Sequence, residues 1–197
     1  SGSTMLAKVL DLHPEIKLMT PIHPEPKYFL KQNYMGKEAY TDLFKKYDKD
    51  HKFFLEKSVS YFEHTDALKR INDDFPDSKV LIILRDPIDR CWSNYKFSVN
   101  NGVENREFVD AINDSKNNKN YAEISVNPFL YIQRGFYDEY LMRVFDIFNK
   151  KNIKVLIFEE FICSSKNLNN LFEWLNLDKI HICKNLFHKK YNKTHDS

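Results

Sequence analysis

The chain has 197 residues, a length that suits one fairly large domain with a well-buried core. Hydrophobic residues make up 42% and charged residues 29%, and the 30 Lys and Arg nearly balance the 28 Asp and Glu, giving a formal net charge of +2. This composition indicates a globular protein and argues against a general nucleic-acid binder. No apolar run approaches the length of a membrane span, so none is predicted in this chain.

The cysteines, Cys91, Cys163 and Cys183, are odd in number and lack metal-ligand spacing. We therefore expect no metal site. A disulfide stays open as an alternative, but a reducing compartment is the simpler interpretation. The sequence also contains no signal peptide, which favours the cytoplasm, although a Golgi-type lumenal location stays open. Nothing in the sequence predicts an oligomeric state.

A turn of small residues opens the chain and leads into a helix predicted for Thr4 to Leu12. Such a turn binds anions, because backbone N–H groups point at the anion and the helix dipole favours negative charge. Ser3 and Thr4 add hydroxyl donors, although an ordinary helix cap has the same residues. Phosphate loops of this kind follow a buried strand, so we expect the parent protein to supply an apolar strand before Ser1.

A proline-rich loop from Thr20 to Leu30 follows a short strand predicted for Glu15 to Met19. Glu25 lies between two of its prolines and precedes Lys27 and two aromatic residues. A carboxylate held rigidly beside apolar rings is suited to act as a general base. An exposed loop glutamate is the alternative, and taken alone the residues favour that alternative.

The next elements are an amphipathic helix at Lys37 to Tyr47, a strand at Phe53 to Glu56 and a helix at Thr65 to Phe75. Lys57 directly follows the predicted strand. It therefore lies at the carboxyl end of that strand, the edge where open α/β sheets bind ligands.

The chain is organised around a strand, a turn and a helix within Lys79 to Ser98. Val80 to Leu84 is an apolar, β-branched run typical of a strand that is covered on both faces of a parallel sheet. Asp86 is a helix N-cap and Pro87 suits the first helical position, so a helix is predicted from Pro87 to Phe97.

Arg85 lies at the end of that buried strand, next to a helix N-terminus. Ser93 lies one or two turns into the helix, and Arg90, three residues before it, shares its helix face. Arg85 and Ser93 can hold one phosphate between them. A surface ion pair for the arginine and a plain surface serine are the alternatives.

The remainder combines polar segments with four more elements. We expect helical turns at Glu107 to Ile112, a polar surface loop at Asn113 to Asn120, a helix at Phe136 to Asn149, a strand at Lys154 to Phe158, a helix at Asn167 to Leu175, and no element in the tail from His181 to Ser197. The alternation of helices and strands predicts an α/β fold with a mainly parallel sheet, in one domain covering residues 1–197.

Four segments, taken in order, are SGSTML, EPKYF, EKSVSYF and LIILRDPIDRCWSNY. Together they resemble the sulfotransferases that use 3′-phosphoadenosine 5′-phosphosulfate (PAPS), most closely the heparan-sulfate and bacterial carbohydrate branches. The RDP motif alone is moderately specific for this family, but the four motifs in this order are a strong sign of the resemblance. The resemblance spans Ser1 to about Thr194 and implies a P-loop-like, three-layer α/β/α fold.

The resemblance also implies a role for each matching residue. Glu25 would be the general base, Lys57 would bind the cofactor near the transferred group, and Lys27 would face the sulfuryl group or acceptor. The residues that would cradle the 5′-phosphosulfate are Ser1, Gly2, Ser3, Thr4 and Met5. Arg85 and Ser93 would grip the 3′-phosphate.

The implied reaction moves a sulfuryl group from PAPS to a hydroxyl or amine of a small-molecule or carbohydrate acceptor, with 3′,5′-adenosine bisphosphate as the product and no metal. Two family features lie outside the chain or are not recognisable in it: the basic residue before SGST and a later basic, Gly-containing cofactor loop. We therefore expect a domain truncated at both ends.

Two alternatives remain open. A P-loop kinase or NTPase needs Gly-Lys-Ser/Thr at the helix entry, whereas Ser3 follows Gly2 here and Arg85, rather than an acid, follows the apolar strand. A non-catalytic nucleotide-binding module would keep the fold and lack turnover.

Overall fold

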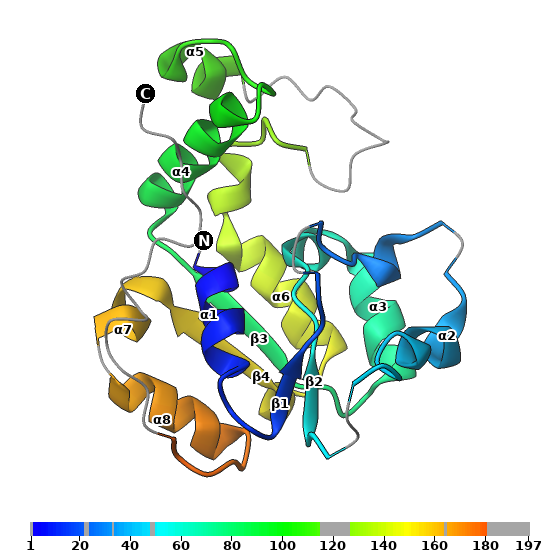
Figure 1. The fold of residues 1–197 in the computed structure, drawn as a ribbon. Coiled ribbons are helices and arrows are strands. Elements are labelled where there is room, and N and C mark those ends of the chain that lie inside the picture. Colours follow the sequence, from blue (N-terminus) through cyan, green and yellow to red (C-terminus); the bar gives the residue numbers. More distant parts are fainter. Residues whose placement is uncertain are drawn as a thin grey trace.

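The computed structural model describes residues 2–21, 24–32, 34–47, 50–114, 127–163 and 165–180 (Figure 1). Within this part of the chain the strands form two parallel pairs: β1 (Ile16–Leu18) with β2 (Phe53–Leu55), and β3 (Val80–Leu84) with β4 (Ile153–Ile157). The predicted α/β class and parallel pairing are thus confirmed. The predicted tail from His181 lies outside the described residues, as does most of the predicted polar loop after Asn113.

Helices surround the strands. The α-helices are α1 (Ser3–Leu10), α2 (Gly36–Asp42), α3 (Thr65–Asp74), α4 (Pro87–Asn100), α5 (Phe108–Asn113), α6 (Tyr137–Ile147), α7 (Phe158–Cys163) and α8 (Ser165–Trp174). Short 3-10 turns are η1 (Tyr28–Leu30), η2 (Val59–Glu63), η4 (Gln133–Gly135) and η5 (Lys150–Asn152). No helix within the described residues combines the length and the apolar character that crossing a membrane requires.

The strand pair β3–β4 separates two hydrophobic cores, which gives the fold three layers. One core joins α1, α7 and α8, and the alternate β3 residues Leu81 and Ile83 pack against it. The other core joins α3 and α6 with Ile82 and Leu84. Because successive strand residues point to opposite faces, β3 contributes side chains to both cores. This arrangement confirms the predicted α/β/α layers.

Several predicted bounds differ from the structure by a few residues, and two of these differences concern the ends of α2 and β4. The helix predicted for Lys37 to Tyr47 ends at Asp42, and the following residues form turns in which the Tyr47 hydroxyl accepts a hydrogen bond from the Thr20 N–H at 2.8 Å. The helical pattern gives way to turns with bonds three residues back, such as those from the Phe44 N–H to the Thr41 carbonyl and from the Tyr47 N–H to the Phe44 carbonyl. The strand predicted to reach Phe158 ends at Ile157, because Phe158 begins α7, whose first turn carries Glu159 and Glu160.

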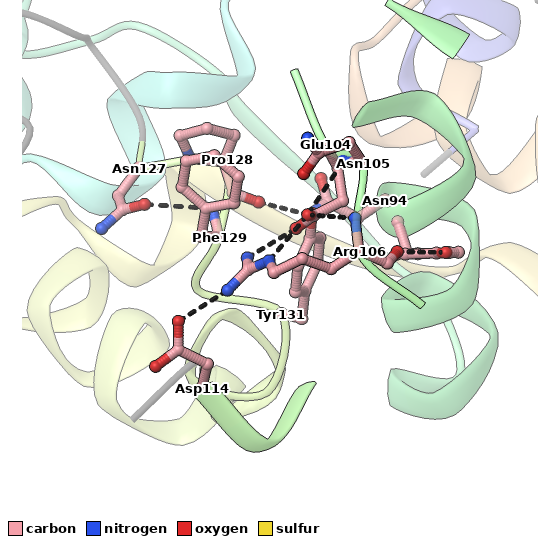
Figure 2. A network of polar contacts seen from close by, with 10 residues as sticks. Asn94, Glu104, Asn105, Arg106, Asp114, Asn127, Pro128, Phe129 and Tyr131 are labelled. Carbon is pink, nitrogen blue, oxygen red and sulfur yellow. Dashed lines mark hydrogen bonds and ion pairs between the residues drawn. The ribbon is translucent and has the colours of Figure 1, made fainter. Parts of the chain in front are cut away.

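A polar network joins the chain after α4 to the chain before α6 (Figure 2). The carboxylate of Glu104, only 1% exposed, accepts hydrogen bonds from Nε of Arg106 at 2.8 Å, from Nη2 at 2.7 Å and from the Tyr131 hydroxyl at 3.0 Å. Nη1 of Arg106 donates to Asp114 at 2.6 Å. Arg90 on α4 donates to the Tyr131 carbonyl, so this network also fixes α4 against the segment before α6.

Candidate active site

The small-residue turn begins α1 in a conformation that requires glycine. Gly2 is the N-cap, with φ +31° in the left-handed region. A Cβ atom at this position would lie 2.2 Å from a ring carbon of Phe158, so a larger residue would clash with the ring. The start of α1 therefore packs closely against the start of α7, just beyond the end of β4.

Arg85 reaches the same phenylalanine from the end of β3. Its guanidinium lies 5.4 Å from the centre of the Phe158 ring. Gly2 and Arg85 therefore contact the same aromatic ring. Because Arg85 directly follows β3 and Phe158 directly follows β4, both residues lie at the carboxyl end of this parallel strand pair. The sequence analysis did not identify Phe158, whose only signal is its place at the end of an apolar strand.

The ion pairs of Arg85 are long. Its guanidinium lies 3.4 Å from Asp89 and 3.9 Å from Glu159, and its side chain is 26% exposed. Nε is buried without a hydrogen-bond acceptor among the described residues. The carbonyl of Arg85 accepts a hydrogen bond from the Tyr137 hydroxyl at 2.9 Å, which fixes the backbone while the guanidinium keeps donors for a further acceptor.

The N-cap predicted for α4 is present. The Asp86 carboxylate accepts hydrogen bonds from the N–H groups of Ile88 at 2.9 Å and Asp89 at 3.0 Å, and Pro87 is the first helical residue. Ser93 is half-buried within this helix. Arg90 instead donates to the Tyr131 carbonyl, and this contact binds it to the segment before α6.

Glu25 and Lys57 form a buried ion pair. Nζ of Lys57 lies 2.5 Å from Oε1 of Glu25, and the two side chains are 9% and 11% exposed. Oε2 of Glu25 accepts a hydrogen bond from the Val59 N–H at 3.1 Å. Glu25 is thus directed at the end of β2 and is not an exposed loop acid.

The other predicted residues contribute in different ways. Lys27 is half-buried, and its N–H donates to the Ser58 hydroxyl at 3.0 Å. The side chains of Thr4 and Met5 are buried, with exposed fractions of 8% and 6%, and Met5 packs in a core. Met5 therefore offers a ligand only its backbone. Ser1 lies outside the described residues.

Among the described residues, no group of His, Cys, Asp and Glu side chains is placed to hold a metal ion. The polar groups at the ends of β2 and β3 are instead a carboxylate, a lysine, an arginine, hydroxyls and backbone N–H groups. This set can bind an anion and accept a proton.

Comparison with known proteins assigns this chain to a family. The family model described as "Sulfotransferase family" matches residues 15–179, a range that includes Glu25, Lys57, Arg85 and Ser93. The fold resembles the crystal structure of a sulfotransferase from Alicyclobacillus acidocaldarius, with a TM-score of 0.75 and 24% identity, over 94% of this chain and 83% of that chain.

Two relatives illustrate the similarity in sequence. The bifunctional heparan sulfate N-deacetylase/N-sulfotransferase 1 of Caenorhabditis briggsae is 26% identical over 189 residues, which are 90% of this chain and 21% of that protein. The heparan sulfate glucosamine 3-O-sulfotransferase 3B1 of Mus musculus is 31% identical over 94 residues, 48% of this chain and 23% of that protein. The chain spans about a tenth to a quarter of the length of the curated relatives it matches. Because the family model covers most of the chain and the fold agrees with it, this chain belongs to the sulfotransferase family.

Proposed function

We propose that this domain moves a sulfuryl group from PAPS to a hydroxyl or amine acceptor, with Glu25 as the general base. The observation that carries the proposal is the buried pair of Glu25 and Lys57, which places a proton acceptor and a cation together at the end of β2. Membership of the sulfotransferase family supports the reaction class.

The residues present fit a doubly anionic nucleotide. Gly2 is the N-cap of α1, and the start of a helix favours an anion because the positive end of the helix dipole lies there. Arg85 has a buried Nε without an acceptor among the described residues. We assign the 5′-phosphosulfate to the start of α1, and the 3′-phosphate to Arg85 and Ser93.

The protein's part in the reaction is positioning and charge stabilisation, as in phosphoryl transfer. PAPS supplies the activated sulfuryl group. Glu25 accepts the proton of the acceptor hydroxyl or amine. Lys57 neutralises negative charge near the leaving phosphate, and because an ammonium group has three donors it can keep its bond to Glu25 at the same time. Lys27, on the loop that carries Glu25, faces the sulfuryl group or the acceptor.

We propose a carbohydrate as the acceptor, with a small molecule as the alternative. The support comes from the relatives whose names specify heparan sulfate. The competing function of a P-loop kinase or NTPase lacks support in the structure, because Ser3 begins α1 where such enzymes have lysine, and Arg85 follows β3.

Replacing the base tests this function. In the full-length protein we expect Glu25→Gln to lower turnover by roughly two to four orders of magnitude, because the amide cannot accept the proton. Affinity for 3′,5′-adenosine bisphosphate, measured by calorimetry, should stay nearly intact. The control is Glu139→Gln, an exposed acid on α6. Full turnover in Glu25→Gln would exclude Glu25 as the base, and loss of turnover in Glu56→Gln alone would transfer that role to Glu56.

A further inference from the structure

Glu56 directly precedes Lys57, but its carboxylate has different partners. Oε1 of Glu56 accepts hydrogen bonds from the Ser58 hydroxyl at 2.5 Å and from the Tyr61 hydroxyl at 2.6 Å. Oε2 is buried and accepts no hydrogen bond from the described residues. Because successive residues of an extended segment point to opposite sides, Glu56 lies behind the ion pair that Lys57 makes with Glu25.

Both hydroxyls that bind Glu56 also bind the loop that carries Glu25. The Ser58 hydroxyl accepts the Lys27 N–H at 3.0 Å, and the Tyr61 hydroxyl accepts the Phe29 N–H at 3.3 Å. A hydroxyl has one proton to donate and lone pairs to accept. Since each hydroxyl gives its proton to Glu56, each presents lone pairs to the loop. Glu56 thereby sets the direction of both hydrogen bonds.

Tyr61 is suited to this arrangement. Burial, together with the nearby Glu56 carboxylate, raises the pKa of Tyr61 well above its usual range. The same two causes raise the pKa of Tyr40, which also lies beside Glu56. Tyr61 therefore stays protonated and donates to Glu56. No negative phenolate forms beside the Glu56 carboxylate.

The loop needs such support at Lys27. This residue has φ +49°, in the left-handed region that non-glycine residues rarely adopt, and it lies two positions after Glu25. Its N–H is held by Ser58, while the Glu25 carboxylate is held by Lys57 and Val59. The segment that follows β2 thus fixes both the backbone of the loop and its carboxylate.

We propose that Glu56 is a positioning residue that holds the Glu25 loop through the hydroxyls of Ser58 and Tyr61, and so aims the Glu25 carboxylate at the acceptor. This proposal rests on the proposed function of Glu25 as the base. A buried carboxylate with one oxygen that lacks a donor costs stability. That cost is consistent with a role in placing the loop rather than in stabilising the core.

The test compares Glu56→Leu, which removes the acceptor oxygens, with Glu56→Gln, which keeps one carbonyl oxygen for the two hydroxyls. Amide hydrogen exchange of Lys27 and Phe29, followed by NMR, reports on the loop directly. In Glu56→Leu we expect both amides to exchange about tenfold faster, as the loss of about one buried hydrogen bond implies. The amide of Phe148, the C-cap of α6 whose N–H bonds to the Val144 carbonyl, should keep its rate. Glu56→Gln should restore most of the protection.

Kinetics of the full-length protein give the second measurement. We expect Glu56→Leu to lower kcat by about 10- to 100-fold, the effect of misplacing a reacting group by about 1 Å, with KM and nucleotide affinity nearly unchanged. Glu139→Leu, at an exposed acid on α6, is the matched control. Unchanged exchange at Lys27 and Phe29 would overturn the proposal, and so would an equal acceleration of exchange throughout α6.

If Glu56→Leu does not fold, two milder variants test the positioning role of Glu56. Ser58→Ala should release only the Lys27 amide and Tyr61→Phe only the Phe29 amide, so release of neither amide contradicts the proposal. Loss of turnover in Glu25→Gln with no change of exchange in the Glu56 variants overturns the positioning role alone. Faster exchange combined with full turnover in Glu25→Gln overturns the assignment of Glu25 as the base.

Discussion

Arg85 illustrates how a single side chain can be held in place and still remain available to a ligand. Its backbone carbonyl is fixed by Tyr137, whereas its guanidinium contacts Asp89 and Glu159 only at 3.4 Å and 3.9 Å. Ion pairs of this length, with partners that are largely exposed, contribute little to stability. A phosphate can therefore bind the guanidinium without breaking a strong contact within the protein.

Arg85→Ala should weaken binding of 3′,5′-adenosine bisphosphate far more than binding of adenosine 5′-phosphate. The expected loss is about 10- to 100-fold, the value of one or two charge-assisted hydrogen bonds. Calorimetry with both nucleotides measures it, and Arg143→Ala on α6 is the control. Equal losses for the two ligands would show that Arg85 does not recognise the 3′-phosphate.

At the level of single residues, the sequence predicts the chemical groups of the site better than their contacts. Lys57 and Arg85 are candidates because each follows a predicted strand, whereas Glu25, between two prolines, is favoured as a site residue only by the family resemblance. The pairing of Glu25 with Lys57 joins residues 32 positions apart, and no local pattern specifies it. The same holds for Glu56, whose partners belong to a 3-10 turn that the sequence analysis did not predict.

Among the elements, α4 depends on its cap. The Asp86 carboxylate satisfies two N–H groups that the helix itself leaves unpaired. We expect Asp86→Ala to lower the free energy of unfolding by about 1 kcal/mol and the melting temperature by roughly 2–4 °C. Asp86→Asn should recover most of this loss, because the amide oxygen still accepts both hydrogen bonds. Thermal unfolding measures both variants, with Asp77→Ala in an exposed turn as the control, and a silent Asp86→Ala would contradict the capping role.

Elements with strong local signals were predicted and those decided by tertiary contacts were not. The strand β3 matches its predicted bounds of Val80 to Leu84, because an apolar, β-branched run between polar residues favours a strand with the same ends as the run. α2 ends at Asp42, and the residues after it form turns that bring the Tyr47 hydroxyl to Thr20, far away in sequence. The signal for α7 was present in Glu159 and Glu160, since acidic residues favour a helix N-terminus.

The expectation of a strand before Ser1 stays a prediction. Within the described residues, β1–β2 and β3–β4 form separate pairs, and residues of both pairs pack against the same core beside α1. We propose that a further parallel strand joins the two pairs in the parent protein. A structure of a longer chain would test this, and a preceding segment that lies elsewhere would contradict it.

In the molecule as a whole, the two cores and the polar network stabilise different parts of the fold. The cores hold α1, α3 and α6 against β3 and β4, so the ends of these strands have fixed places. The arm formed by α4 and α5 extends beyond both cores (Figure 1). The Glu104 and Arg106 network therefore supplies much of what ties this arm to the segment before α6 (Figure 2).

The stability of the whole fold should consequently depend on the charge of Glu104. Hydrogen bonds from Arg106 lower the pKa of the Glu104 carboxyl from its ordinary value of 4.5 to about 2. A pKa that is lower in the folded state means that the ionised form favours folding. The contribution is fully present above about pH 4.5 and is lost as the pH falls toward about 2. We expect it to amount to about 1–3 kcal/mol, with the lower end set by solvent screening of the partly exposed Arg106.

Urea unfolding at a series of pH values measures this contribution. Glu104→Gln should be less stable than the natural protein at pH 7, because the neutral amide loses the charged partner of Arg106. The difference should shrink between about pH 4.5 and pH 2, where the natural protein loses the same charge. Glu107→Gln, at an exposed acid nearby, should leave the pH profile unchanged. If the two glutamine variants have the same profile as the natural protein, the arm is held by its apolar contacts, among them the ring contact between Tyr95 and Phe108, and not by the buried carboxylate.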